Sequence, residues 1–186
     1  MSKQTEVIIS GFGGQGALFA GQLLAYAGMD EDKQVTWIPS YGPEMRGGTA
    51  HCITIISDEE IGSPFVRRPA AAIVLNQPSL DKYGPLVRPG GVLIIGGTFG
   101  EGYTSRSDIR EIRVPAQEIA NELGNARLAN VVCLGALIAA TKVLPLEAVE
   151  QALEHHLPER HRHLLSANKE ALRRGASLVT DQELAA

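Results

Sequence analysis

The sequence predicts a three-layer α/β/α sandwich built on a mostly parallel sheet. Three short apolar runs, 7–10, 70–75 and 92–95, show almost no alternation of apolar and polar residues, which is typical of strands covered on both faces. A glycine-rich turn joins the first of these runs to a helix-forming segment, as in a β–α–β unit. From residue 116 onward the pattern is mainly helical.

The expected elements follow in order along the chain. Strands are predicted at 7–10, 35–38, 51–56, 70–75, 92–95 and 109–114, the last an edge strand ended by Pro115. Helices are predicted at 15–27, from 76–79 onward, and at 116–123, 130–143, 146–156 and 159–178, with Gly28 and Gly124 as helix stops. The strand at 51–56 follows a long loop, so its direction stays open and the sheet is either parallel or mixed. No repeat or linker divides the chain, which favours a single domain over residues 1–186 with a helical C-terminal part.

Composition argues against several classes of function. A net charge of −4 and an aromatic content of 5% do not suit a nucleic-acid binder. Two cysteines, Cys52 and Cys133, cannot supply the four thiolates of an iron–sulfur or zinc site within one chain, and are expected to be reduced, buried thiols. We find neither a signal peptide nor an apolar run long enough for a membrane helix, so a cytoplasmic location is expected.

The glycine-rich turn is the first candidate site. Gly11, Gly13 and Gly16 match G-x-G-x-x-G, with Gly14 as an additional glycine. Glycine adopts positive φ and lets main-chain N–H groups approach a ligand closely, while the following helix presents unpaired N–H groups and the positive end of its dipole. A pyrophosphate suits this position in a Rossmann-like fold, held by the N–H groups of residues 13–16, including Gln15. The alternative is a tight turn that packs closely and binds nothing.

Two specific phosphate motifs do not fit. A dinucleotide fold usually offers an acidic residue at the end of its second strand to bind ribose, but here that strand ends Trp37-Ile38-Pro39-Ser40. The acidic run 30–32 precedes the strand and lies at its other end. The missing acidic residue therefore argues against NAD binding. The absence of Lys-Ser or Lys-Thr after the glycines argues against a P-loop.

The loop at 39–48 is the second candidate site, because it follows the second strand at the edge where the glycine-rich turn is expected. Ligands of open α/β sheets bind at that edge. Arg46 can form two parallel hydrogen bonds with a phosphate or carboxylate, and Glu44 can orient Arg46 or a partner's side chain. Tyr41 and Met45 can pack against a partner. A surface loop stiffened by prolines and carrying a Glu–Arg pair explains the pattern equally well.

The remaining polar clusters point to no complete catalytic group. Asn76, Gln77 and Ser79 stand at the same edge and can donate to an anion, although helix capping explains Asn76 or Ser79 as well. The histidines at 155, 156, 161 and 163 have no metal-binding spacing and are expected to be solvated. We find no G-x-S-x-G and no convincing Cys–His pair. The chain therefore has the features of a subunit that binds or positions something for a partner, without catalytic or metal-binding residues of its own.

Several longer strings carry a family resemblance. They are Gly-Phe-Gly-Gly-Gln-Gly at 11–16, Pro-Ser-Tyr-Gly-Pro-Glu-Met-Arg-Gly-Gly-Thr at 39–49, Ile-Gly-Ser-Pro at 61–64, Asn-Gln-Pro-Ser at 76–79, Asn-Val-Val-Cys-Leu-Gly at 130–135 and Ala-Asn-Lys at 167–169. Together they resemble the gamma subunit of 2-oxoacid:ferredoxin oxidoreductases, most closely the 2-oxoglutarate type. The string at 39–49 is far more specific than the glycine turn.

The resemblance implies a division of labour between subunits. The complex would oxidatively decarboxylate a 2-oxoacid, transfer the acyl group to coenzyme A (CoA) and reduce ferredoxin. Thiamine diphosphate and Mg²⁺ would lie between alpha and beta subunits, and 4Fe–4S clusters in beta or a delta subunit. This chain would hold CoA at the glycine-rich turn, while Ser40, Tyr41, Glu44 and Arg46 shape the loop that faces the thiamine-bearing subunits.

Two rival functions stay open at this point. One is a stand-alone nucleotide-dependent dehydrogenase, and the other is a purely structural assembly subunit with an empty glycine turn. Self-association of the isolated chain as a homodimer, through the surface meant for its partners, is also left open.

Overall fold

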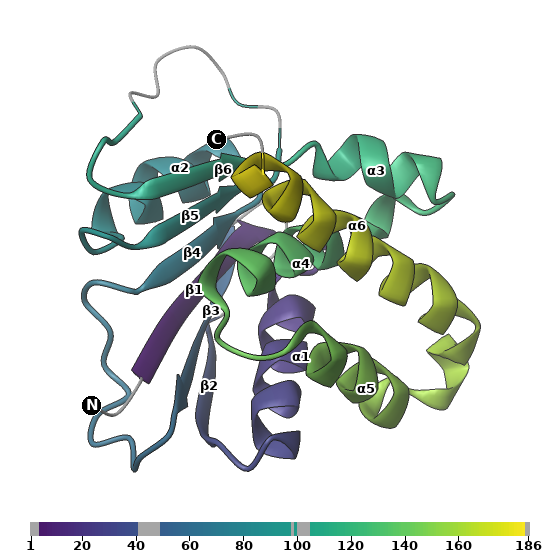
Figure 1. Ribbon diagram of the computed structural model, residues 1–186, viewed down its shortest axis with the longest axis horizontal. Helices are drawn as coiled ribbons and strands as arrows, with labels where there is room; N and C mark the ends of the chain where they lie inside the picture. Colours follow the sequence, from purple (N-terminus) through teal and green to yellow (C-terminus); the bar gives the residue numbers. More distant parts are fainter. Residues whose placement is uncertain (1–3, 41–48, 98, 100–104, 185–186) are drawn as a thin grey trace.

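A six-stranded mixed sheet forms the centre of the molecule in a computed structural model that describes residues 4–40, 49–97, 99 and 105–184 (Figure 1). Its order is β2-β3-β1-β4-β5-β6. The strands are β1 (Gln4–Phe12), β2 (Gln34–Ser40), β3 (Thr49–Ser57), β4 (Ala71–Val74), β5 (Val92–Ile95) and β6 (Arg110–Arg113). Only β3 runs antiparallel to its neighbours, β1 and β2. The predicted fold class is confirmed, and the open question about the third strand is answered.

Helices cover the two faces of this sheet unequally (Figure 1). The helices are α1 (Ala17–Asp30), α2 (Gln77–Tyr83), α3 (Ala116–Glu122), α4 (Ala129–Thr141), α5 (Leu146–His156) and α6 (Leu165–Leu184), with 3-10 turns η1 (Gly84–Leu86), η2 (Ala126–Leu128) and η3 (Glu159–Leu164). On one face α1 packs on β1, β2 and β3, while α4 packs on β4 and β5. Helix α2 lies on the opposite face against β4 and β1. Among the described residues, no helix combines the length and the apolar character needed to cross a membrane.

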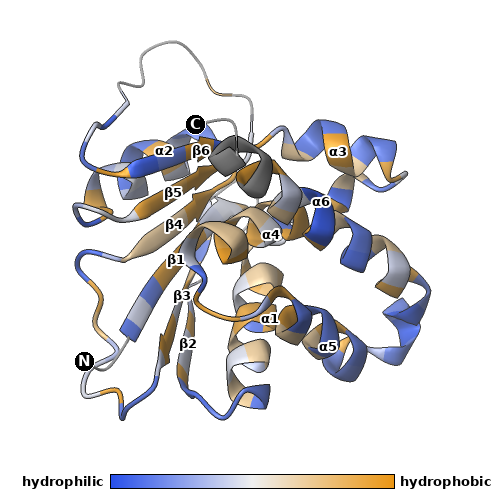
Figure 2. Ribbon diagram, viewed as in Figure 1, coloured by the Kyte–Doolittle hydropathy of each residue, from blue (hydrophilic) through white to orange (hydrophobic). Residues whose placement is uncertain are grey.

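Alternation along the central strand divides the apolar side chains into two cores. Val7 and Ile9 of β1 belong to the larger core beneath α1 and α4, whereas Ile8 belongs to the smaller core beneath α2. In Figure 2 the central strands and α4 are mostly apolar, while the outer surfaces of α5 and α6 are hydrophilic. Burial on both faces explains why β4 and β5 read as unbroken apolar runs.

The predicted stop at Gly28 is wrong, because α1 continues to Asp30. Gly28 is buried inside the helix, and a Cβ there would lie only 2.9 Å from Cγ2 of Val35 on β2. This glycine therefore permits close contact between helix and strand. The predicted start of the last helix at residue 159 is also wrong: η3 first turns the chain, and the α-helix begins at Leu165.

Helices α4 and α6 pack with their backbones almost in contact. A Cβ built on Gly135 of α4 would lie 2.0 Å from the carbonyl oxygen of Leu172, and one built on Gly175 of α6 would lie 1.8 Å from that of Val132. Both carbonyl oxygens are main-chain atoms, so a side-chain rotation cannot relieve either contact. Two small residues facing each other thus set the distance between these helices.

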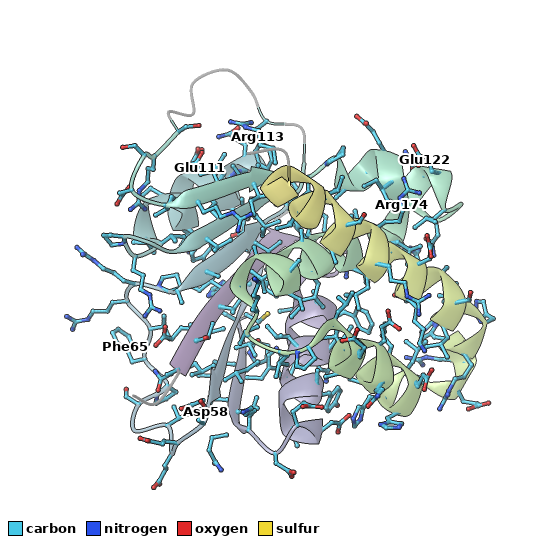
Figure 3. The ribbon with its side chains drawn as sticks, in the orientation of Figure 1. Asp58, Phe65, Glu111, Arg113, Glu122 and Arg174 are labelled. Carbon is cyan, nitrogen blue, oxygen red and sulfur yellow. The ribbon has the colours of Figure 1, made fainter. Side chains whose placement is uncertain are left out.

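Ion pairs join the outer helices at the surface. Figure 3 shows Glu122 of α3 and Arg174 of α6 close together, and their charged atoms lie 2.7 Å apart. Arg173 makes two hydrogen bonds of 2.7 Å to the carboxylate of Glu150 on α5. Exposed pairs of this kind contribute little stability each, so apolar packing fixes the helix layer.

Arg106 ties the approach to β6 to the end of α2. Its Nη1 donates to the carbonyl oxygens of Gly84 at 3.0 Å and Val87 at 2.8 Å, while Nε and Nη2 donate to the Asp108 carboxylate at 2.9 and 2.6 Å. The hydrogen bond from Arg106 holds the pKa of Asp108 below its ordinary value. Because the folded-state pKa is lowered, this contribution to stability is present above the unfolded-state pKa of Asp108 and is lost as pH falls through the folded-state value.

Arg106→Ala is expected to raise the pKa of Asp108 to its ordinary range. Arg106→Lys keeps the positive charge but loses the paired geometry, so it should raise the pKa by a smaller amount. An NMR titration of the Asp108 carboxyl group measures both effects. The same pKa in all three proteins would contradict the assignment of the shift to Arg106.

Candidate functional site

The glycine-rich turn and Ser40, from the described start of the second predicted segment, lie at one edge of the sheet. Strands β1 and β2 end there, and β3 begins there: Ser10 pairs with His51, which in turn pairs with Ser40. Ser40 therefore lies at the same edge as the glycine-rich turn, as the sequence predicts. Tyr41, Glu44 and Arg46 lie outside the described residues.

The glycine-rich turn leads directly into α1. The N–H of Gln15 donates to the carbonyl oxygen of Phe12 at 3.0 Å, which closes the turn. Gly14 and Gly16 have positive φ values of 96° and 77°, so both positions strain any other residue. Gly16 is the N-cap of α1, and no side-chain hydrogen bond from the described residues caps this helix. The first N–H groups of the helix therefore face the turn without a capping side chain.

The side chain of Gln15 fastens the turn to the neighbouring strand. Its Oε1 accepts from the Phe12 N–H at 2.6 Å and from Nδ2 of Asn76 at 3.2 Å, and its Nε2 donates to the carbonyl oxygen of Leu75 at 3.0 Å. Gln15 thus uses both its main-chain N–H and its side chain within the protein. Of the four predicted N–H donors, those of Gly13, Gly14 and Gly16 make no main-chain hydrogen bond to a turn or loop carbonyl of the described residues.

Asn130, at the start of α4, supports the turn from the other side. Its Nδ2 donates to the carbonyl oxygen of Gly16 at 2.8 Å, and a Cβ on Gly16 would lie only 2.3 Å from that nitrogen. Asn130 is buried, and its Oδ1 has no hydrogen-bond partner among the described residues. Sequence reasoning did not assign Asn130 to the site, although a lone amide at the start of a nearly apolar helix was an available signal.

Asn76 and Gln77 each make a hydrogen bond at the start of α2. Asn76 is the N-cap of α2, where its Oδ1 accepts from the Ser79 N–H at 2.9 Å. Gln77 is partly exposed and donates from Nε2 to Asp81 at 2.7 Å. Ser79 Oγ lies 2.8 Å from Ser10 Oγ beneath the sheet edge. Helix capping, the alternative to ligand binding, accounts for the contact between Asn76 and Ser79, and binding of a ligand by Asn76 or Gln77 stays a prediction.

A small cavity of about 210 Å³ opens beside the turn. Its lining includes the turn itself, the end of β5 and the segment before α4: Gly14, Gln15, Leu75, Gly96, Gln117, Ala126, Arg127 and Ala129. Among the described residues of this lining, Arg127 is the one with a positive charge and none is acidic. No atom of the described residues lies within 4 Å of a Cβ built on Gly14, so this glycine faces open space. The cavity suits a small anion.

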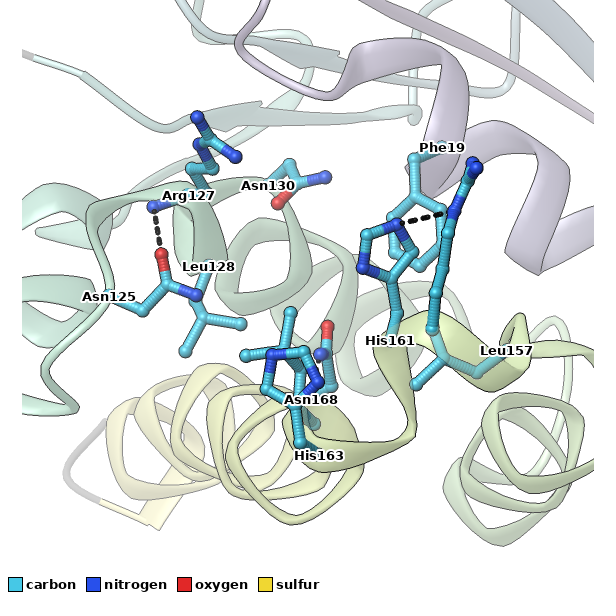
Figure 4. A pocket seen from close by; sticks show the side chains of 11 residues that line it. Phe19, Asn125, Arg127, Leu128, Asn130, Leu157, His161, His163 and Asn168 are labelled. Atoms are coloured by element: carbon cyan, nitrogen blue, oxygen red, sulfur yellow. Dashed lines mark hydrogen bonds between the residues drawn. The ribbon is translucent and has the colours of Figure 1, made fainter.

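A larger cavity of about 540 Å³ lies on the other side of Asn130 (Figure 4). Figure 4 shows Asn125 and Arg127 on one side of it, and Phe19 and His161 on the other. The lining comes from α1, η2, α4 and the η3 region: Phe19, Asn125, Arg127, Leu128, Asn130, Leu157, Arg160, His161, His163, Leu164 and Asn168. His161 and His163 are exposed, as predicted, but sequence reasoning missed that they share a cavity wall.

The two thiols and the remaining histidines supply no nucleophile or metal site. Burial raises the pKa of Cys52 to about 11 and that of Cys133 to about 12, so neither is a thiolate at neutral pH. Burial, with a smaller effect of Lys82, lowers the pKa of His51. Over the part of the chain that is described, no three His, Cys, Asp or Glu side chains are grouped to hold a metal ion.

The family follows from comparison with known proteins. Residues 6–178 match the family model described as pyruvate ferredoxin/flavodoxin oxidoreductase. The chain belongs to this family. The resemblance on which the sequence prediction rests, to gamma subunits of 2-oxoacid:ferredoxin oxidoreductases, is thereby confirmed.

Two curated members of the pyruvate ferredoxin/flavodoxin oxidoreductase family illustrate the match. The chain is 44% identical to ketoisovalerate oxidoreductase subunit VorA of Methanothermobacter marburgensis over 137 residues, which are 74% of this chain but only 28% of VorA. It is 34% identical to 2-oxoglutarate synthase subunit KorC of Methanocaldococcus jannaschii, over 88% of this chain and 90% of KorC.

Solved structures share the fold. The gamma subunit of keto/oxoacid ferredoxin oxidoreductase from Geobacter sulfurreducens is 30% identical with a TM-score of 0.78, covering 95% of this chain and 99% of that one. The 2-oxoglutarate:ferredoxin oxidoreductase of Magnetococcus marinus, solved with 2-oxoglutarate, CoA and succinyl-CoA bound, has a TM-score of 0.81 at 21% identity. It covers 96% of this chain and 31% of that chain, and at this identity it shows the fold alone.

Proposed function

We propose that this chain is the gamma subunit of a multi-subunit 2-oxoacid:ferredoxin oxidoreductase and that its glycine-rich turn binds the pyrophosphate of CoA. The complex oxidatively decarboxylates a 2-oxoacid, transfers the acyl group to CoA and passes the electrons to ferredoxin. Alpha and beta subunits, with or without a delta subunit, carry thiamine diphosphate, Mg²⁺ and 4Fe–4S clusters. This chain is not catalytic alone.

The observation that carries the proposal is the uncapped start of α1 next to a small positively charged cavity. Gly14 faces open space, Gly16 begins the helix without a side-chain cap, and Arg127 lines the adjoining cavity. N–H groups at a helix start and a guanidinium are typical ligands of a diphosphate. None of the described residues that line the cavity carries a carboxylate to repel it. The CoA in the Magnetococcus marinus complex, which shares this fold, supports the choice of ligand.

For the 2-oxoacid we propose 2-oxoglutarate. Support comes from KorC, a 2-oxoglutarate synthase subunit that this chain matches along most of both lengths. The second candidate is ketoisovalerate, because the identity to VorA is higher over the part that aligns. Assays of the purified complex with each acid decide between them: a higher kcat/KM for ketoisovalerate than for 2-oxoglutarate would contradict the proposal.

Substitution of Gly14 tests the turn. Gly14→Asp places a carboxylate where the diphosphate is proposed to bind, so CoA affinity should fall by at least about tenfold, which is about 1.4 kcal/mol. Gly14→Asn is the matched control, since it has the same size and the same backbone strain but no charge. Titration of the complex with CoA measures both, and it should show a much smaller loss for the asparagine variant.

Two further controls complete this experiment. Gly62→Asp adds the same charge at another open position, where a Cβ meets nothing within 4 Å, and should leave CoA affinity unchanged. Equal CoA affinity in wild type and Gly14→Asp would favour the purely structural subunit. Turnover of a nicotinamide cofactor by the isolated chain would favour the stand-alone dehydrogenase.

A further inference from the structure

We infer that the larger cavity is a second anion subsite of the same ligand, which takes its adenosine 3′-phosphate while the glycine-rich turn holds its pyrophosphate. This inference rests on the proposed function, because it assumes that CoA binds at the turn. It concerns residues of η2 and η3 to which the sequence pattern assigned no ligand role.

Charge is the first observation. Of the eleven described residues that line the cavity, four are arginine or histidine, namely Arg127, Arg160, His161 and His163, and none of the eleven is acidic. This accumulation stands out in a chain whose net charge is −4. The nearby acid Glu159 lies outside the lining and faces Arg162 at 3.7 Å. A cavity with positive walls and no carboxylate attracts a phosphate.

Position is the second observation. Asn130 donates to the carbonyl oxygen of Gly16 and also lines the larger cavity. Arg127 lines both the larger cavity and the small one beside Gly14. The turn and the larger cavity therefore share their boundary, formed by η2 and the first turn of α4. One ligand with two separate anionic groups can occupy both.

The shape and surface of the cavity fit a nucleotide better than a free phosphate. Its volume of about 540 Å³ is far larger than one phosphate needs and lies in the range of small-molecule sites. Phe19 offers an aromatic wall for a purine, and the buried Leu128 and Leu157 form an apolar part of the lining.

Arg160 is held toward this wall. Its Nε donates to Nε2 of His161 at 3.2 Å, and both side chains are exposed, so they are free to receive a ligand from solvent. This contact orients the guanidinium while leaving its terminal N–H₂ groups as phosphate donors. Substitution of Arg160 should therefore weaken binding of the 3′-phosphate most.

The test compares CoA with 3′-dephospho-CoA, which lacks only the 3′-phosphate. Calorimetric titrations use the full chain together with the polypeptides that co-purify with it. Wild type should bind CoA about tenfold more tightly than 3′-dephospho-CoA, as expected for a charge-assisted contact. Arg160→Gln should remove most of this preference by weakening CoA alone. Arg162→Gln, on the same 3-10 turn but outside the cavity lining, should keep it.

The outcomes separate the two proposals. If wild type binds both ligands equally while Gly14→Asp weakens both, the turn binds CoA and the second subsite is wrong. A preference for CoA that Arg160→Gln and Arg162→Gln both retain also overturns the subsite. If wild type binds neither ligand, the proposed function fails and the subsite fails with it.

Discussion

Replacement of Gly175 by alanine is expected to lower the free energy of unfolding by about 3 kcal/mol. The new Cβ would lie 1.8 Å from the carbonyl oxygen of Val132 and 3.1 Å from the main-chain nitrogen of Ala136. These are backbone atoms of α4, so no rotamer change relieves the clash and the two helices must move apart. Separation would loosen a core to which Val132, Ala136 and Leu172 all belong.

The sign of the change in the free energy of unfolding distinguishes a packing clash from helix propensity. Alanine is a better helix former than glycine by about 1 kcal/mol, so without the clash the substitution would stabilise α6. Chemical denaturation followed by circular dichroism gives the change in free energy of unfolding. Gly62→Ala, a glycine-to-alanine change in open space, should alter it by less than about 0.5 kcal/mol. A Gly175→Ala variant as stable as wild type would mean that α4 and α6 are not in backbone contact.

Gly96→Ala is expected to be strongly destabilising, and Cys133→Ala is expected to rescue it. A Cβ on Gly96, just after β5, would lie 2.1 Å from Sγ of Cys133 on α4. The thiol is fully buried and packed, so it cannot simply turn away. We expect Gly96→Ala to cost about 2 kcal/mol, as overpacking of a core does.

A double-mutant cycle measures the rescue. Cys133→Ala alone should cost about 1 kcal/mol through the small cavity that it leaves. The new methyl group of Gly96→Ala would fill part of that cavity, so the double variant should be more stable than the sum of the single changes predicts, by about 1–2 kcal/mol. Additive costs would show that the two positions do not touch. Because Gly96 also lines the small cavity beside Gly14, the cycle tests the packing behind the proposed site.

The sheet was predictable because each strand carries its own signal. Residues 92–95 were predicted with the boundaries that β5 has, and 146–156 with those of α5. These segments combine a clear apolar pattern with prolines or glycines at their ends. The signal failed at Gly28, since a glycine that ends a helix and one that admits a neighbouring strand look alike in sequence. Only the contact with Val35 distinguishes them.

The site was predictable only where it depends on local sequence. The glycine-rich turn and Ser40 meet at one edge because parallel strands end there. Asn130 reaches the turn across 114 residues of chain, and Arg160 shares a cavity with Arg127 because α6 folds back on α4. The spacing of residues within a local segment of sequence does not indicate such contacts. Gln15 shows the reverse case, since the pattern predicts that its main-chain N–H binds a ligand, whereas this group donates to the carbonyl oxygen of Phe12.

The reversed direction of β3 places the end of β2 and the start of β3 side by side. The chain leaves β2 at Ser40 and enters β3 at Thr49 on the same edge of the sheet, and Ser40 already pairs with His51. Both anchors of the intervening segment are thus fixed by one ladder of hydrogen bonds next to the start of α1. Because antiparallel neighbours need no crossover helix between them, a change in the pairing of β2 with β3 would act directly on the sheet edge that supports the turn.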